Sequence, residues 1–155
     1  MRIITAEIIN EMNQPGADTP EFDAKWDECL KNLAEHNNQL VEKCLPSVAK
    51  FINNVQLFEA VVHSRSFNFN NDSYQFVVGI PSEAIYSLSY EITADPVIIK
   101  HEGSGFDADQ KSFWLYDEFH KIDNHYEHHI IFSDGYEFQV PFVFFYPRKQ
   151  SWFEE

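Results

Sequence analysis

The sequence is poor in the residues that mark several common classes of protein. It has two cysteines, Cys29 and Cys44, and no CxxC pair, so we expect two buried free thiols and not a disulfide framework. Only 5 of the 155 residues are glycine, and no glycine-rich phosphate loop, GxSxG or HExxH motif is present. Apolar runs are too short to span a membrane, and the N-terminus is too short and charged for a secretory signal. We expect a cytoplasmic protein that needs no cofactor.

Basic residues are also scarce. Lys and Arg number 11 against 25 Asp and Glu, which gives a formal net charge of −14 spread along the whole chain. Nucleic acids and anionic membranes are bound through basic patches, so direct binding to either is disfavoured. An acidic domain suits a basic protein partner, although solubility alone also explains acidity in many small proteins.

Aromatic residues, by contrast, are abundant, at 16% of the chain, and 155 residues can form one domain with its own core. Residues 1–54 carry apolar residues at helical spacing. Thr5 and Thr19 are candidate N-caps, Pro20 suits a first helical position, and residues 36–38 should end the second helix. Its predicted inner stripe is Phe22, Trp26, Cys29, Leu30 and Leu33. A third helical segment is predicted around Pro46.

The hydrophobic period changes to two at Val55, which predicts strands. Residues 55–147 then form an antiparallel meander of about six or seven strands, and residues 148–155 form a tail. Helices that precede strands in this way indicate a single α+β domain over residues 1–155.

The densest aromatic stretch, residues 112–146, predicts three antiparallel strands. Asp134 and Gly135 suit a two-residue hairpin turn, which sets Ile131 opposite Phe138. In one plausible register of the preceding strand pair, Glu118 lies opposite His128. The inner face would then hold Phe113, Leu115, Phe119, Ile131, Phe138, Val140, Phe142 and Phe144. The other face, here called the polar-aromatic face, would hold Trp114, Tyr116, Glu118, His120, Tyr126, His128, Phe132, Glu137 and Gln139.

Three clusters of polar residues are candidates for metal binding or catalysis. Four of the seven histidines lie within residues 120–129, but their spacing matches no known zinc set, so we expect no metal and would assign His120 and His128 if one bound. Asp117 would be buried and needs a partner, for which His129 is the candidate. Loop 101–110 holds Glu102, Asp107 and Asp109, whose order does not match an EF-hand.

Several short segments resemble small bacterial proteins of the polymorphic-toxin immunity kind. They are Trp114-Leu115-Tyr116-Asp117-Glu118, Tyr126-Glu127-His128, Phe132-Ser133-Asp134-Gly135, Leu45-Pro46 and Leu57-Phe58-Glu59-Ala60. The resemblance covers about the last two-thirds of the chain, and its motifs are structural. It implies a cytoplasmic protein that binds and neutralises a toxin, with no catalytic residue.

The sequence thus favours an acidic binding protein, and not an enzyme, that occludes a basic toxin or effector domain. The expected binding residues are Trp114, Tyr116, Glu118, Tyr126, His128 and Glu137 on the polar-aromatic face, extended by Glu102, Asp107 and Asp109. Two alternatives stay open. One is a small metal-binding protein or hydrolase that uses the histidines of residues 120–129. The other is a phage-type inhibitor or nucleic-acid mimic.

Overall fold

The computed structural model describes residues 2–68 and 72–151 as helices followed by an antiparallel sheet, which confirms the α+β prediction. The helices are α1 (Ala6–Met12), α2 (Pro20–Leu40) and α3 (Pro46–Asn54). The strands are β1 (Val61–Asn68), β2 (Ser73–Ile80), β3 (Ala84–Ile92), β4 (Val97–Lys100), β5 (Trp114–Ile122), β6 (His125–Phe132) and β7 (Tyr136–Ser151). No helix of the described residues is both long and apolar enough to cross a membrane.

The helices begin where the sequence predicts. The Thr5 hydroxyl accepts a hydrogen bond from the Ile8 amide at 3.3 Å, and the Thr19 hydroxyl accepts one from the Phe22 amide at 3.1 Å. Both threonines therefore cap a free amide of a first turn. The second helix, however, continues through residues 36–38 to Leu40, because His36 bonds the Phe119 carbonyl at 2.7 Å and Leu40 packs in the inner core.

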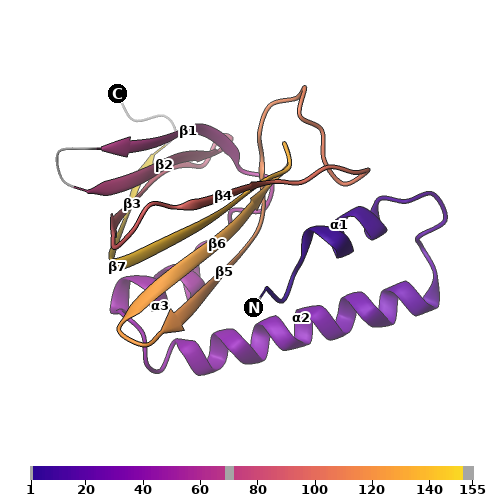
Figure 1. The fold of residues 1–155 in the computed structure, drawn as a ribbon, viewed down its shortest axis with the longest axis horizontal. Coiled ribbons are helices and arrows are strands. Elements are labelled where there is room, and N and C mark those ends of the chain that lie inside the picture. The colour runs from indigo at the N-terminus through magenta and orange to yellow at the C-terminus, as the bar shows by residue number, and fades with distance from the viewer. Residues whose placement is uncertain (1, 69–71, 152–155) are drawn as a thin grey trace.

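The sheet has the strand order β1-β2-β3-β7-β6-β5, and β4 also pairs with β7 (Figure 1). It curls until its two edges meet. The Glu59 amide donates to the Trp114 carbonyl at 2.7 Å, and the Trp114 amide donates to the Ala60 carbonyl at 2.8 Å. Val61 forms an isolated antiparallel bridge with Phe113. Edge strands that pair in this way leave fewer free backbone groups.

The curled sheet buries apolar side chains on both faces. Inside the curl, α3 contributes Val48 and Phe51 to a large core that includes Phe76, Tyr90 and Phe142. On the outer face, α1 and α2 cover a second, smaller cluster. Its members are Ile4, Ile8, Ile9 and Ile131, with Phe22, Trp26, Cys29, Leu33, Phe106, Leu115 and Tyr116 packed against them. Figure 1 shows α2 running along the β5 side of the sheet.

The N-terminal segment is held to this outer face by a buried carboxylate. Glu118 accepts hydrogen bonds from the backbone amides of Ile3 at 2.9 Å and Ile4 at 2.7 Å. It also bonds His120 at 3.0 Å and lies 3.8 Å from the Arg2 guanidinium. Burial alone would raise the pKa of Glu118, but these donors and the Arg2 charge together lower it.

The predicted hairpin at Asp134 and Gly135 exists, but its loop is one residue longer than expected. Strand β6 ends at Phe132 and β7 begins at Tyr136, and Gly135 has a φ of +94°. A three-residue loop that ends on a left-handed glycine is a common alternative to the two-residue turn. As a result Phe138 lies opposite Ile130, not Ile131. The register slips by one residue, which exchanges the two faces of β6.

The pairing of β5 with β6 also differs from the expected register by one residue, so that prediction was wrong too. Phe119, not Glu118, lies opposite His128. A bulge between Trp114 and Tyr116 also turns Trp114 to the inside of the sheet. The predicted polar-aromatic face is therefore divided: Tyr116, Glu118, His120, Glu137 and Gln139 lie on the outer face, whereas Trp114, Tyr126, His128 and Phe132 belong to the inner one.

Three further expectations need correction. Phe144 is 47% exposed because a bulge opposite Glu91 and Ile92 shifts β7 by one residue. Residues 148–151 are not a tail but continue β7 against β3, while residues 152–155 lie outside the described part of the chain. Leu30 is 42% exposed and does not belong to the core. Cys29 and Cys44 are free and half-buried.

Candidate functional site

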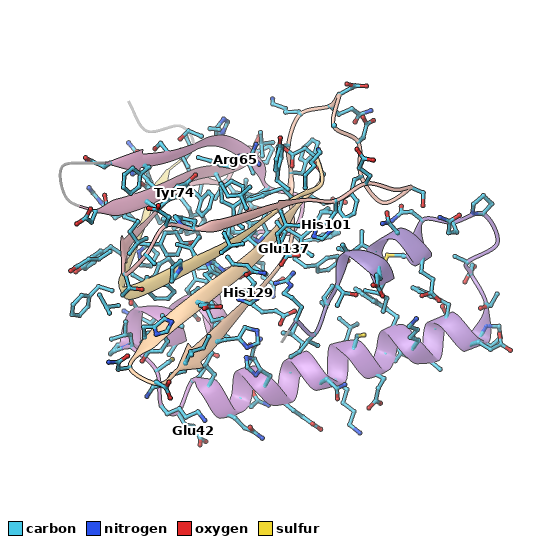
Figure 2. All side chains as sticks on the ribbon, in the orientation of Figure 1. Glu42, Arg65, Tyr74, His101, His129 and Glu137 are labelled. Carbon is cyan, nitrogen blue, oxygen red and sulfur yellow. The ribbon has the colours of Figure 1, made fainter. Side chains whose placement is uncertain are left out.

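Most of the predicted binding residues are buried and are not available to a partner in this structure. Trp114 and His128 belong to the interior of the curl, as does the 8%-exposed Tyr126. Glu118 lies on the outer face, where the N-terminal segment covers it. Glu137 lies on the same face and contacts His101 (Figure 2). Helices thus take up the surface that we assigned to a partner, because that face contains enough apolar area to bind them.

Of the remaining predicted binding residues, Tyr116 is half-buried and the three acidic residues are exposed. Glu102, Asp107 and Asp109 lie on the loop between β4 and β5, and this loop is tied to α1. The Asn10 side chain donates to the Glu102 carbonyl at 2.9 Å and accepts from the Gly105 amide at 2.8 Å. The loop is therefore fixed next to the helices.

Exposed carboxylates lie on this loop and on the two helices next to it. They are Glu7 and Glu11 on α1, Glu21, Asp23, Asp27 and Glu28 on α2, and Glu102, Asp107 and Asp109 on the loop. We call this surface the acidic end. The underlying cluster joins its parts, since Ile8 of α1, Phe22 of α2 and Phe106 of the loop pack together there. Lys25 forms an ion pair with Glu11 at 2.6 Å within it.

The histidines of residues 120–129 do not converge. His128 points inside the sheet, whereas the rings of His120 and His129 lie on the outer face with centroids 5.0 Å apart. His120 and His128, which we would have assigned if a metal bound, therefore lie on opposite faces of the sheet, because the register slip separates them. Within residues 2–68 and 72–151, no group of three His, Cys, Asp or Glu residues is arranged to hold a metal ion.

A groove of about 380 Å³ opens between α2, α3 and β5. Its walls are Leu33 and Asn37 of α2, Phe51 and Ile52 of α3, residues 55–58 of the following loop and residues 115–119 of β5. The lining mixes apolar side chains with polar ones such as Asn37, Gln56 and Asp117, and Phe58 at its rim is 53% exposed. The rings of Phe58 and Tyr116 lie with centroids 5.3 Å apart and form an aromatic wall.

Asp117 places a carboxylate in this groove. One oxygen accepts a hydrogen bond from the Trp114 indole at 3.2 Å, and the other accepts one from His128 Nε2 at 2.7 Å. On its far side, His128 Nδ1 bonds the Tyr90 hydroxyl at 2.7 Å. The Phe119 ring stacks on His128 with centroids 3.7 Å apart. The carboxylate is thus fixed by groups that are themselves packed in the core.

The positions of the protons between Tyr90, His128 and Asp117 follow from the burial of Tyr90 and His128. Burial lowers the pKa of His128, although its hydrogen bond to Asp117 opposes the shift, so the ring is neutral. Burial also raises the pKa of Tyr90 well above its ordinary value, and the charge of Asp117 adds to this effect. Tyr90 therefore donates to His128 Nδ1, and His128 donates its Nε2 proton to Asp117.

The Asp117 carboxylate has no cation in direct contact, although it interacts with the Arg2 charge at longer range. Its ionic contact is with the neutral His128, and no Lys or Arg in the described ranges forms an ion pair with it. Its side chain is 27% exposed, whereas His128 is fully buried. A ligand in the groove therefore meets Asp117 and not the imidazole, which suits binding better than proton transfer by His128.

Part of this site was predicted from the sequence. We expected Asp117 to need a histidine partner but assigned His129, because the expected register was one residue off. Phe58 and Leu33 were not predicted as site residues, since they approach β5 only through the packing of helices distant in sequence. Compared with known proteins, the chain matches no family model and no curated sequence.

Proposed function

We propose that the protein is an immunity protein that binds a basic bacterial toxin or effector domain and neutralises it by occlusion in the cytoplasm. The observation that supports this proposal best is the acidic end. There, exposed carboxylates lie on two helices and one loop that pack around one apolar cluster. Such a surface attracts a basic partner from a distance and excludes partners of like charge.

Two further features support a binding role. The net charge of −14 favours attraction of a positively charged domain over the whole surface. The loop that carries Glu102 is braced by Asn10, so a partner would meet carboxylates already held in place. The sequence segments that resemble immunity proteins agree with this role.

Co-expression tests the proposal. The open reading frame next to this gene is placed under an inducible promoter, with and without this protein, and growth is followed after induction. We expect induction to arrest growth and this protein to restore it, with a 1:1 complex of the two purified proteins on size-exclusion chromatography. A toxic product that is neither rescued nor bound would contradict the proposal, as would an adjacent gene product without toxicity.

The acidic end is tested by charge reversal in the same assay. Asp107→Lys with Asp109→Lys should slow association with the toxin, because both carboxylates are exposed on the loop. Glu42→Lys is the matched control, since Glu42 is exposed beyond the other end of α2 (Figure 2). Equal effects of the loop variant and the control would place the contact surface elsewhere.

A further inference from the structure

We infer that the groove between α2, α3 and β5 binds an arginine side chain presented by the partner protein, with Asp117 as its anion and the Phe58–Tyr116 wall as its stacking surface. This inference rests on the proposed function, because it specifies one contact that the neutralised domain makes. The acidic end would attract the partner, and the groove would fix the partner's position on the surface.

The geometry of Asp117 suits a guanidinium. A carboxylate offers about four acceptor positions on its two oxygens. Trp114 occupies one position on the first oxygen, and His128 occupies one on the second. One position therefore remains on each oxygen, and the two parallel N–H groups of an arginine can fill them together. A lysine ammonium is a point donor and cannot match both positions in this way.

The aromatic wall supports the same choice. Phe58 is exposed at the rim although it is large and apolar, and its ring lies 36° from the plane of Tyr116. Trp26 meets Tyr116 edge-on with ring centroids 5.5 Å apart, which holds the tyrosine in place. A planar guanidinium stacks favourably on such rings, and its alkyl stem can cover Leu33 and Ile52.

Charge complementarity favours a cation over an apolar or anionic group in the groove. The Asp117 carboxylate forms no ion pair with any Lys or Arg that the structure describes, although the Arg2 charge acts on it at longer range. Its hydrogen bonds from Trp114 and His128 are supplied from the buried side, so they hold the charge in place without neutralising it. An anionic or purely apolar side chain would leave this charge partly desolvated and unpaired.

The test uses short peptides and the full chain, so it does not depend on finding the toxin. Three capped tripeptides, Gly-X-Gly with arginine, lysine or citrulline at X, are titrated into isotopically labelled protein and followed by NMR. We expect the arginine peptide to shift the Tyr116 amide and the Trp114 indole N–H. Citrulline has the same shape without the charge and should bind at least about tenfold more weakly. Equal binding of arginine and citrulline would overturn the inference.

Substitutions in the groove test whether the arginine peptide binds there. Asp117→Asn keeps the size of the side chain, removes the charge and should weaken arginine binding about tenfold or more. Glu59→Gln is the matched control, because Glu59 is an exposed neighbour that does not line the groove. Phe58→Ala changes only an exposed rim side chain, so the fold is retained even if Asp117→Asn unfolds the protein. It should weaken arginine binding by several-fold.

The outcomes separate this inference from the proposed function. Rescue of growth by a protein that does not bind the arginine peptide would leave the immunity role intact and overturn the arginine site. Equal losses in Asp117→Asn and Glu59→Gln would also overturn it, because general acidity would then explain binding. Peptide binding that depends on Asp117 and Phe58, without rescue from the adjacent toxin, would support the site and contradict the proposed function.

Discussion

At the scale of single residues, the Tyr90–His128–Asp117 chain shows how the core positions a surface charge. His128 bonds both of its neighbours, Asp117 also accepts from Trp114, and Tyr90 and His128 are buried. Removal of the Tyr90 hydroxyl leaves His128 Nδ1 without a donor inside the core. Tyr90→Phe should therefore lower the free energy of unfolding by about 1–3 kcal/mol, measured by urea denaturation.

Tyr146→Phe provides the control for this prediction. Tyr146 is 53% exposed, so the same loss of a hydroxyl should change the free energy of unfolding by less than about 0.5 kcal/mol. If the two variants are equally stable, the hydrogen bond from Tyr90 is not a significant part of the core.

Buried histidines also predict a dependence of stability on pH. Burial lowers the pKa of His128 and His129 below the ordinary value of 6.5, although Asp117 and Glu127 oppose the shifts, while Arg2 and His120 reinforce them. Between the ordinary and the folded pKa, the unfolded chain therefore binds more protons than the folded one. Stability is full above about pH 6.5 and falls as the pH drops below it.

The measurement is urea denaturation at pH 7.5, 6.5 and 5.5 for the wild type and for His129→Gln. The variant removes one titrating ring, so its stability should fall less steeply over this interval. The lowered pKa of Glu118 adds a second loss of stability only below its ordinary value of 4.5. A free energy of unfolding that rises from pH 7.5 to 5.5 would show that these rings are not buried as neutral imidazoles.

At the scale of elements, local signals predicted where helices and strands begin better than how they pair. The threonine caps, the hairpin position and the inward side chains of β7 at Phe138, Val140 and Phe142 are as expected. The predicted faces of β6 were wrong, because two-residue and three-residue loops both suit Asp134 and Gly135. One extra loop residue shifts the register and exchanges the two faces of the strand.

Two other differences have long-range causes. Trp114 turns inward at a bulge, where the start of β5 meets residues 59–61 and the sheet closes. Strand β7 continues past Pro147 because β3 pairs with it, although proline disfavours strand interiors. The groove around Asp117 lies between α2, α3 and β5, which are distant in sequence, so it could not be predicted from spacing along the chain.

The element β7 offers a test of the assigned faces. Phe142 is fully buried, and Phe142→Ala should lower the free energy of unfolding by about 3–5 kcal/mol. Phe144 is 47% exposed beyond the bulge, and Phe144→Ala should cost far less. Both values come from urea denaturation of purified variants. Equal losses would show that the bulge in β7 does not turn Phe144 outward.

At the scale of the whole molecule, α3 packs inside the curl and α1 and α2 pack on the outer face, and α1 and α2 expose several carboxylates. The carboxylates of the acidic end and the Asp117 groove both adjoin α2, from its N-terminal half to Leu33 and Asn37. A partner that spans this helix would meet both. We therefore propose that the protein recognises a positively charged domain along α2.

The most direct test of this central claim is calorimetric titration of the adjacent-gene toxin domain with this protein at two salt concentrations. We expect one toxin domain per chain and an affinity that weakens as NaCl rises from 50 to 300 mM, because salt screens attraction between opposite charges. Absence of binding, or an affinity that salt does not change, would contradict the account.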